Sequence, residues 1–257
     1  MPARNKYLTI SVDDGHPTDL ITAELLDQFD LKATFYFPKA NPERAVMTDQ
    51  HLRQIAKFFD VGGHTISHKS LKVMSDEVAF REINDGKNWL EDLTGQSVSA
   101  FCYPQGKFNS RTPDLIQSAG FKGARTCMHN LNDFPSNPYL WGLSTQAYSH
   151  SPRIHFQHAL LESNFRGALD YFRIHKLARD WSQHFKNALD HVGQNGGIAH
   201  LYFHSWEIDE QGQWDKLREV LEDASKRKNF IRVSNSELFD LWPRNREAVW
   251  AQRKTAS

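Results

Sequence analysis

The sequence predicts an α/β domain built on a parallel sheet. Short apolar or β-branched runs alternate with amphipathic helical segments about seven times along the 257 residues, without an internal repeat or a linker. Crossover helices are what joins parallel strands, so this alternation fits a parallel arrangement. The pattern alone does not distinguish an open, doubly wound sheet from a closed barrel. The length allows one large domain or two small ones.

The first half of the chain contains the clearest patterns. A β-branched, apolar run from residue 8 onward predicts a strand that ends at Asp13-Asp14-Gly15, although Asp-Asp-Gly is also ordinary turn chemistry. Gly95 is a suitable C-terminal stop for the long amphipathic pattern before it. Further strands are predicted at 31–37, 98–103 and 121–127, and helices at 17–29, 48–59, 75–93 and 112–119.

The second half is less regular. Residues 146–178 are rich in aromatic residues and histidine, and only 156–161 and 168–174 have weak helical periodicity. Histidines in and near this region have no informative spacing and form at best a polar lid over a site: His129, His150, His155, His158 and His175. Around this region we predict strands at 139–144, up to His204 and at 230–233, helices at 180–192 and 214–227, and a polar tail at 243–257.

The composition argues against several classes of protein. Lys+Arg and Asp+Glu both number 31, so no overall field attracts nucleic acid or a membrane. No run approaches the roughly 20 apolar residues of a membrane span, and no apolar leader-like segment precedes the first strand. Cys102 and Cys127 both fall on predicted strands, where buried free thiols are expected rather than a disulfide. We therefore expect a cytoplasmic protein.

Carboxylates and imidazoles recur where strands are predicted to end. Alternation along a strand sends Asp13 and Asp14 in opposite directions, so we expect them to have different roles. His64 and His68 converge if their segment is a helical turn or a tight loop, and with one carboxylate they would form a three-ligand metal site open to water. His204 ends a mostly apolar strand, where barrel enzymes place catalytic groups. The chain has 13 histidines, so no single pattern is specific.

Taken in this order, the motifs resemble those of the polysaccharide deacetylase superfamily, the NodB-homology or carbohydrate esterase family four proteins. These proteins have a strand ending in Asp-Asp-Gly, then a His-Thr-x-x-His motif like 64–68 and a late histidine like His204. Between them, Phe-Cys-Tyr-Pro-Gln-Gly-Lys-Phe-Asn at 101–109 is similar to a third motif of the family. The resemblance covers residues 6 to 242. It implies one catalytic domain, 1–257, with a distorted (β/α) barrel that usually has seven strands.

The resemblance also implies roles for the motif residues. A divalent metal, with zinc first and cobalt or nickel as alternatives, would be held by Asp14, His64 and His68. Asp13 would be the general base, and His204 would be the acid that protonates the departing amine. The backbone amide of residue 105, which is Gln105 here in place of a family tyrosine, would stabilise the oxyanion.

Other positions depart from the family pattern or stay open. Many members have an arginine where this chain has Cys102; Arg125, on the next predicted strand, is a candidate replacement, and a surface arginine is an equal alternative. Asp180-Trp181 matches letters of a fourth motif, but Trp181 fits the apolar stripe of its helix better. Aromatic faces stack on sugar rings, so the following residues are candidates for lining a sugar site or for packing in the core: Tyr103, Trp141 and Trp206, with Glu207 beside them.

These inferences predict a metal-dependent hydrolase that removes an N-acyl group, above all acetyl, from an amino sugar. The expected substrate is a nucleotide-linked, lipid-linked or oligosaccharide intermediate of surface-glycan assembly in the cytoplasm. One alternative is hydrolysis of another amide, such as an N-formyl sugar or a small non-sugar amide. Another is a non-catalytic glycan-binding protein on the same fold, which the missing arginine at position 102 favours and the intact aspartates and histidines oppose. A metal-dependent isomerase or lyase would need further carboxylate ligands, for which we find no matching spacing.

Overall fold

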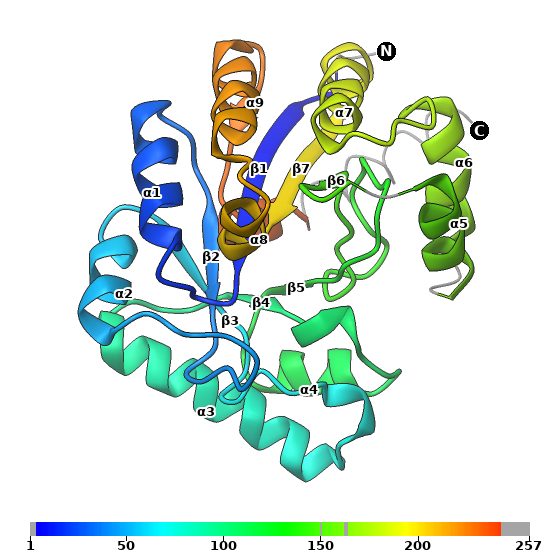
Figure 1. Ribbon diagram of the computed structural model, residues 1–257. Helices are drawn as coiled ribbons and strands as arrows, with labels where there is room; N and C mark the ends of the chain where they lie inside the picture. Colours follow the sequence, from blue (N-terminus) through cyan, green and yellow to red (C-terminus); the bar gives the residue numbers. More distant parts are fainter. Residues whose placement is uncertain (1–3, 150, 162–163, 243–257) are drawn as a thin grey trace.

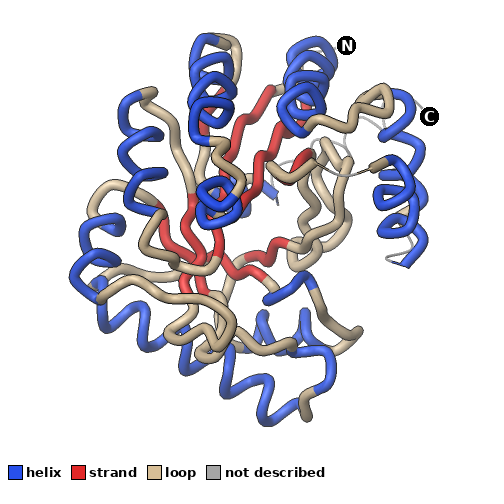
Figure 2. Tube along the Cα trace, in the orientation of Figure 1, coloured by secondary structure: helices blue, strands red, loops and turns tan. Residues whose placement is uncertain are grey.

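β1 (Lys6–Asp13) is an interior strand of a curved parallel sheet and pairs with β2, β7 and β8. The computed structural model describes residues 4–149, 151–161 and 164–242. In this part of the chain the main path of the sheet has seven strands in the order β5-β4-β3-β2-β1-β7-β6, and short β8 pairs with β1 off that path. The strands curl into part of a barrel with helices on its outer side (Figures 1 and 2). The predicted distorted seven-stranded barrel is therefore confirmed.

The other strands are short except β7. They are β2 (Thr34–Phe37), β3 (Asp60–Gly63), β4 (Ala100–Cys102), β5 (Gly123–Arg125), β6 (Thr145–Gln146), β7 (Gly197–Phe203) and β8 (Ile231–Arg232). Every ladder between them is parallel. Their carboxyl ends therefore meet at one edge of the sheet, where the predicted motifs lie.

Helices lie in the connections between these strands, except between β5 and β6, which a segment without helix joins. They are α1 (Asp19–Gln28), α2 (Asp49–Ala56), α3 (Asp76–Thr94), α4 (Thr112–Ser118), α5 (Pro152–Leu161), α6 (Phe165–Arg173), α7 (Trp181–Asn195), α8 (Ser205–Glu210), α9 (Trp214–Lys226) and α10 (Asn235–Asp240). Single 3₁₀ turns occur at Leu71–Val73 and Pro104–Gly106. No helix within the described residues is long and apolar enough to cross a bilayer.

Local capping explains where several helices begin and end. Thr48 and Ser75 accept hydrogen bonds from backbone amides at the starts of α2 and α3, and Gly95 ends α3 in the left-handed conformation, as predicted. Asp180 caps α7 with its side chain. Trp181, the next residue, is only 1% exposed in the apolar core, which confirms that it packs.

The structure differs from the sequence prediction mainly in the second half. The predicted strand at 139–144 is wrong, because only Trp141 there forms an isolated bridge to Arg125, and the true strand β6 begins at Thr145. Helices α8 and α10 were not predicted, since both are only six residues long and carry little periodicity. The predicted tail at 243–257 lies outside the described residues.

Candidate active site

The motif residues converge at the carboxyl edge of the sheet. Asp13 is the last residue of β1, Cys102 of β4 and Arg125 of β5, while His64 and His204 directly follow β3 and β7. All of these side chains are buried or nearly so, because each lies in the space enclosed by the curved sheet. The sheet therefore brings together segments that are up to 190 residues apart in sequence, such as Asp14 and His204.

Asp14, His64 and His68 form the candidate metal centre. Oδ1 of Asp14 lies 3.0 Å from Nε2 of His68 and 3.6 Å from Nε2 of His64. One ligand atom from each residue lies within 4.8 Å of the others. Asp14 and His68 both have left-handed backbones, with φ of 80° and 53°, which turn their side chains toward the same point. The sequence-predicted ligand set is thus brought together.

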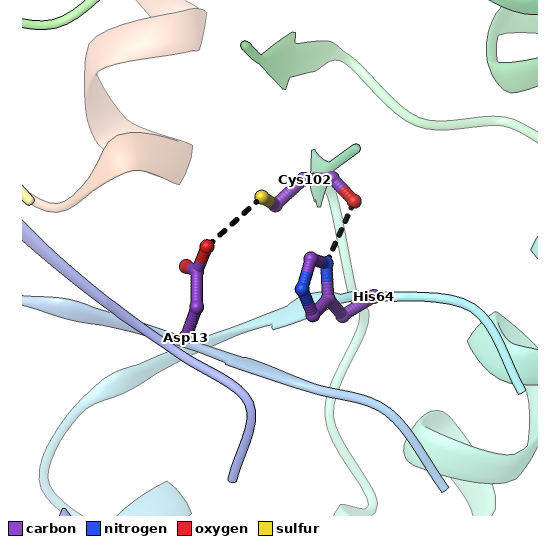
Figure 3. A group of neighbouring side chains, drawn as sticks. All are labelled: Asp13, His64 and Cys102. Carbon is purple, nitrogen blue, oxygen red and sulfur yellow. Dashed lines mark hydrogen bonds between the residues drawn. The ribbon is translucent and has the colours of Figure 1, made fainter. Parts of the chain in front are cut away.

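Hydrogen bonding fixes the orientation of the His64 ring. Its Nδ1 donates to the carbonyl oxygen of Cys102 at 2.9 Å (Figure 3). Nε2 therefore keeps its lone pair, and it lies 3.6 Å from Oδ1 of Asp14. The close approach of β2 and β3 depends on glycine, since a Cβ on Gly62 would lie 2.3 Å from the Tyr36 ring. The backbone carbonyl and the glycine together hold His64 in place.

The three residues fit a bound cation. Among the described residues, the buried Oδ1 of Asp14 has no hydrogen-bond partner of normal geometry, and unpaired buried polar atoms are costly. Burial alone raises the pKa of Asp14, but the two imidazoles outweigh it and hold that pKa well below its usual range. An ionised carboxylate oxygen and two imidazole nitrogens are a donor set that zinc, cobalt and nickel all accept.

Asp13 points to a different set of partners from its neighbour. Its Oδ2 forms an ion pair with Arg125 and accepts a hydrogen bond from the Cys102 thiol, with Sγ 3.3 Å away (Figure 3). NH2 of Arg125 also lies 2.7 Å from that Sγ. Arg125 is fully buried and pairs with Asp13, so it is not a surface arginine. That it replaces the arginine of other family members stays a prediction.

These contacts determine the charge on Asp13. Burial by itself raises the pKa of Asp13, but Arg125, His64 and His204 outweigh it and leave the pKa below its usual value. Burial raises the pKa of the Cys102 thiol well above normal, so the thiol stays protonated and donates. Within the described part of the chain, Oδ1 of Asp13 has no hydrogen-bond partner.

His204 lies on the other side of Asp14, with Nε2 3.7 Å from Oδ2. Its Nδ1 donates to Glu207 at 2.8 Å, and its Nε2 lies 2.9 Å from the hydroxyl of Tyr202. Burial lowers the pKa of His204, but the hydrogen bond to Glu207 and the charge of Asp14 raise it to about 9. His204 is therefore cationic at neutral pH.

Residues 1–124 match the family model described as polysaccharide deacetylase. This match extends over just under half of the chain and supports its resemblance to the polysaccharide deacetylase superfamily. Polysaccharide deacetylases are hydrolases, so the predicted enzyme class is confirmed at the level of the family. A comparison with curated proteins gives no match.

Solved structures of similar fold extend over most of the chain. A Mycobacterium smegmatis protein assigned as a polysaccharide deacetylase has a TM-score of 0.59 at 15% identity, covering 96% of both chains. A family 4 acetyl xylan esterase from Clostridium thermocellum, in complex with cobalt, has a TM-score of 0.55 at 16% identity. The match covers 92% of this chain and 91% of the esterase chain. A family 4 pseudoenzyme from Bacillus anthracis has a TM-score of 0.53 at 15% identity. The match covers 91% of this chain and 66% of the pseudoenzyme chain. At these identities the likeness shows the fold.

The other predicted site residues have mixed outcomes. Gln105 lies in the turn after β4 with a left-handed φ of 58°, and the hydrogen bonds of that turn are donated by the amides of Gly106 and Lys107. Trp206 lies at the site, but its indole N–H donates to Oδ2 of Asp14 at 3.0 Å, so it orients the carboxylate. A contact of Trp206 with substrate stays a prediction.

Two predicted sugar-lining residues are core residues instead. Tyr103 is fully buried between Phe101 and Phe108, and its hydroxyl donates to the carbonyl of Tyr139 at 2.8 Å. Trp141 is 2% exposed and packs against Phe134 and Phe239. Neither ring offers a face to a ligand. Of the two alternatives left open by the sequence, the structure therefore favours core packing for both residues, since aromatic residues near motifs can equally complete the core.

The histidine-rich region does not form the expected lid where it is described. His175 is fully buried and stacks on His184 of α7, with ring centroids 3.7 Å apart. His129 is also buried and lies 3.2 Å from the side chain of Gln146. His150 and the side chains of His155 and His158 lie outside the described residues.

Sequence reasoning missed the partner of His204. Glu207 was predicted only as a possible sugar-lining residue, yet it bonds the imidazole from the first turn of α8. The signal was the spacing i, i+3, which places the two side chains on the same side if a helix begins at Ser205. Recognising that short helix would have predicted the pair.

Proposed function

We propose that this chain is a metal-dependent amide hydrolase that removes an N-acyl group, above all acetyl, from an amino sugar. The whole chain would act as one catalytic domain. The observation that carries the proposal is the single cluster in which Asp14, His64 and His68 face one another, with Asp13 and His204 beside them. This cluster combines a cation-binding donor set, an ionised carboxylate and a cationic imidazole.

Asp14, His64 and His68 would hold the ion, with zinc first and cobalt or nickel as alternatives. When bound, such an ion supplies a Lewis acid that polarises a carbonyl and lowers the pKa of water. The unpartnered Oδ1 of Asp14 and the fixed tautomer of His64 support this assignment. The cobalt complex of the similar esterase from Clostridium thermocellum also supports a divalent ion.

Asp13 would take the proton of the attacking water at Oδ1. That oxygen has no hydrogen-bond partner, whereas Oδ2 is held by Arg125 and Cys102. The lowered pKa of Asp13 keeps the carboxylate ionised and ready to accept. Arg125 and Cys102 would act as positioning residues, since they orient the carboxylate without facing the reactant.

His204 would protonate the departing amine at Nε2. Amines leave poorly unless they are protonated, so the reaction requires an acid that is charged at working pH. The pKa of about 9 meets this requirement, and Glu207 holds the ring from its other nitrogen. Asp13 and His204 are thus a base and an acid whose environments move their pKa values apart.

The backbone amide of Gln105 would donate to the oxyanion of the tetrahedral intermediate. The backbone of Gln105 is left-handed, and the hydrogen bonds of its turn are donated by the amides of the two residues that follow it. Both observations support an amide of Gln105 that can donate to the oxyanion. The side chain is exposed, and its Nε2 lies 3.3 Å from Glu43. A glutamine here would therefore affect the rim of the site more than the chemistry.

The proposed substrate is an N-acylated amino sugar carried on a nucleotide or a lipid, or within an oligosaccharide, during surface-glycan assembly in the cytoplasm. The family supports an acetylated carbohydrate. The buried thiol of Cys102, which is not in a disulfide, supports a reducing compartment. An N-formyl sugar or another small amide is the alternative substrate.

A non-catalytic glycan-binding function is the second candidate, because a protein of similar fold from Bacillus anthracis is a pseudoenzyme. The buried ion pair between Arg125 and Asp13 opposes it. A carboxylate and a guanidinium kept together in the interior are costly to retain without a use for the charge.

Elemental analysis and acetate release test the proposal together. Protein purified without chelator is expected to contain about one equivalent of a divalent metal, and to release acetate from at least one nucleotide- or lipid-linked N-acetyl sugar. Asp14→Asn should lose both metal and turnover, whereas the matched neighbour Asp13→Asn should keep the metal and lose turnover. Full activity in Asp13→Asn would contradict the assigned base, and metal-free wild-type protein would contradict the metal centre.

A further inference from the structure

The helix pair α5–α6 carries a row of exposed large apolar side chains. Their exposed fractions are 46% for Phe156, 70% for Leu160, 70% for Phe165, 45% for Leu169 and 64% for Phe172. On α6 the spacing 165, 169, 172 places three of them on one side of the helix. Together these five residues form what we call the α5–α6 surface, and soluble proteins seldom expose such a row without a partner.

α6 is fixed so that this side faces outward. Gly167 and Tyr171, on the opposite side, are buried. The Tyr171 hydroxyl donates to the carbonyl of Ala178 at 3.1 Å. Asn164 caps the helix by accepting from Gly167 at 2.9 Å and donates to the carbonyl of His129 at 2.9 Å. Because both ends are held to the body of the protein, the apolar row cannot turn inward by rotation of the helix.

Basic side chains border the α5–α6 surface. Arg166 and Arg173 lie seven residues apart beside the apolar row of α6, and both are exposed. Residues 151–179 contain Arg153, Arg166, Arg173, Lys176 and Arg179 against Glu162 and Asp170. Of these basic residues, Arg166 forms ion pairs with Asp133 and Asp170. The whole chain is balanced at 31 charges of each sign, so this excess is local. An apolar row beside arginine and lysine is the pattern of helices that lie in the headgroup region of a membrane.

The α5–α6 surface is joined to the edge of the sheet that carries the candidate active site. The two helices follow β6, and Gln146 at the end of β6 is in register with Tyr202, whose hydroxyl contacts His204. Figure 1 shows α5 and α6 as a pair set to one side of the helices that surround the sheet.

We propose that the α5–α6 surface docks onto an anionic lipid bilayer. The phenylalanine and leucine side chains enter the interface, and the neighbouring arginine and lysine side chains contact lipid phosphates. Charge complementarity favours a bilayer over a second copy of this chain, because a symmetric pairing would bring the same cationic side chains face to face. The docking is peripheral and does not depend on catalysis.

Vesicle flotation of the full chain tests this proposal. Wild-type protein is expected to float with vesicles of phosphatidylcholine and phosphatidylglycerol and not with phosphatidylcholine alone. Leu169→Ser with Phe172→Ser should weaken partitioning at least about tenfold, since both side chains leave the apolar row. The double variant Arg173→Glu, Lys176→Glu should weaken binding to the anionic vesicles by at least about 25-fold at low salt. This follows because each positive charge removed costs roughly a fivefold loss of binding. Phe58→Ser is the matched control, because Phe58 is 77% exposed but lies outside the α5–α6 surface. This variant should bind anionic vesicles as the wild type does.

Several outcomes would overturn the proposal. One is the absence of wild-type flotation with anionic vesicles, and another is equal flotation of the wild type and the Leu169, Phe172 variant. A dimer in sedimentation velocity that this variant dissolves, without vesicle binding, would assign the surface to a second copy. Binding that disappears only when residues 243–257 are removed would assign it to the tail. No substrate is present in these measurements, so a failure of the proposed hydrolase activity leaves them unaffected.

Discussion

The two sides of β1 and β7 differ in what they carry. The outward side chains of both strands are apolar and belong to the main core, together with residues of α7 and α9: Leu8, Ile10, Val12, Leu201 and Phe203. The inward side chains are polar or aromatic and equally buried: Thr9, Ser11, Asp13, His200 and Tyr202. The inward groups are hydrogen-bonded to one another or to the far side of the sheet, as in the 2.9 Å contact between Ser11 and His200.

This difference shows how one strand serves two purposes. Outward residues gain stability by leaving water, and this gain needs no exact partner. Inward residues are buried polar groups that cost free energy unless each finds its partner. We therefore expect outward substitutions to change stability with little change in catalysis, and inward substitutions to change activity or its pH dependence.

The largest expected effect follows from removing Arg125 on the inward side. Arg125→Met leaves Asp13 as an unpaired buried carboxylate, which should cost about 3–5 kcal/mol of unfolding free energy. Because the base loses its orientation, kcat should also fall by about 100-fold or more. Chemical denaturation and acetate release measure the two effects. Arg111→Met, at an exposed ion pair with Asp76, is the control and should change stability by less than about 1 kcal/mol.

A double exchange makes the same comparison sharper. Cys102→Arg combined with Arg125→Cys returns the arginine to the position that many family members use. If orientation of Asp13 is the function of Arg125, this variant should recover more activity than Arg125→Cys alone. Equal activity in the two variants would indicate that Arg125 acts through some other contact.

On the outward side, Leu201→Ala should affect stability alone. Leu201 is fully buried in the main core, so the truncation is expected to cost about 2–5 kcal/mol of unfolding free energy. kcat/KM should stay within about threefold of the wild-type value below the melting temperature. A loss of activity as large as that of Arg125→Met, in protein that is still folded, would remove the distinction between the two sides.

His200 makes the inward side sensitive to acid. Burial and the charge of Arg125 lower the pKa of His200 from 6.5 to about 3, so the unfolded chain binds this proton more readily than the folded protein. The contribution of neutral His200 to the free energy of unfolding is therefore fully present above pH 6.5. It is lost as the pH falls from 6.5 toward 3. Between pH 7.5 and pH 4.5, His200→Gln should lose about 2–3 kcal/mol less unfolding free energy than the wild type. Chemical denaturation at both pH values measures this difference. An identical pH dependence in the variant would contradict this account.

The smallest effect is expected at Glu207, which acts on His204 from α8. The acid is needed in its protonated form, so activity should fall as the pH rises through about 9. Glu207→Gln removes the carboxylate that raises this pKa, and the alkaline limb of the kcat/KM profile should move down by at least about one pH unit. Glu210→Gln, on the same helix and 57% exposed, should leave the profile unchanged.

Particular residues show how far the sequence could predict the site. The two-residue period of a strand correctly separated Asp13 from Asp14, and motif order correctly assembled Asp14 with His64 and His68. The bond from Trp206 to Asp14 spans 192 positions, and no local pattern predicts such a pair. Tyr103 and Trp141 were assigned to the sugar site because hydrophobic pattern does not distinguish a core aromatic from a lining one.

The sequence by itself determined the strand and helix alternation, the two-sided character of β1, and the residue types available at each strand end. These properties are local, because backbone periodicity and side-chain polarity act within a few residues. Only the tertiary structure decided that Arg125 pairs with Asp13 and that Glu207 raises the pKa of His204. The same holds for the exposure of the apolar side chains of the α5–α6 surface. Such outcomes depend on the curvature of the sheet and on which distant groups it brings within hydrogen-bonding distance.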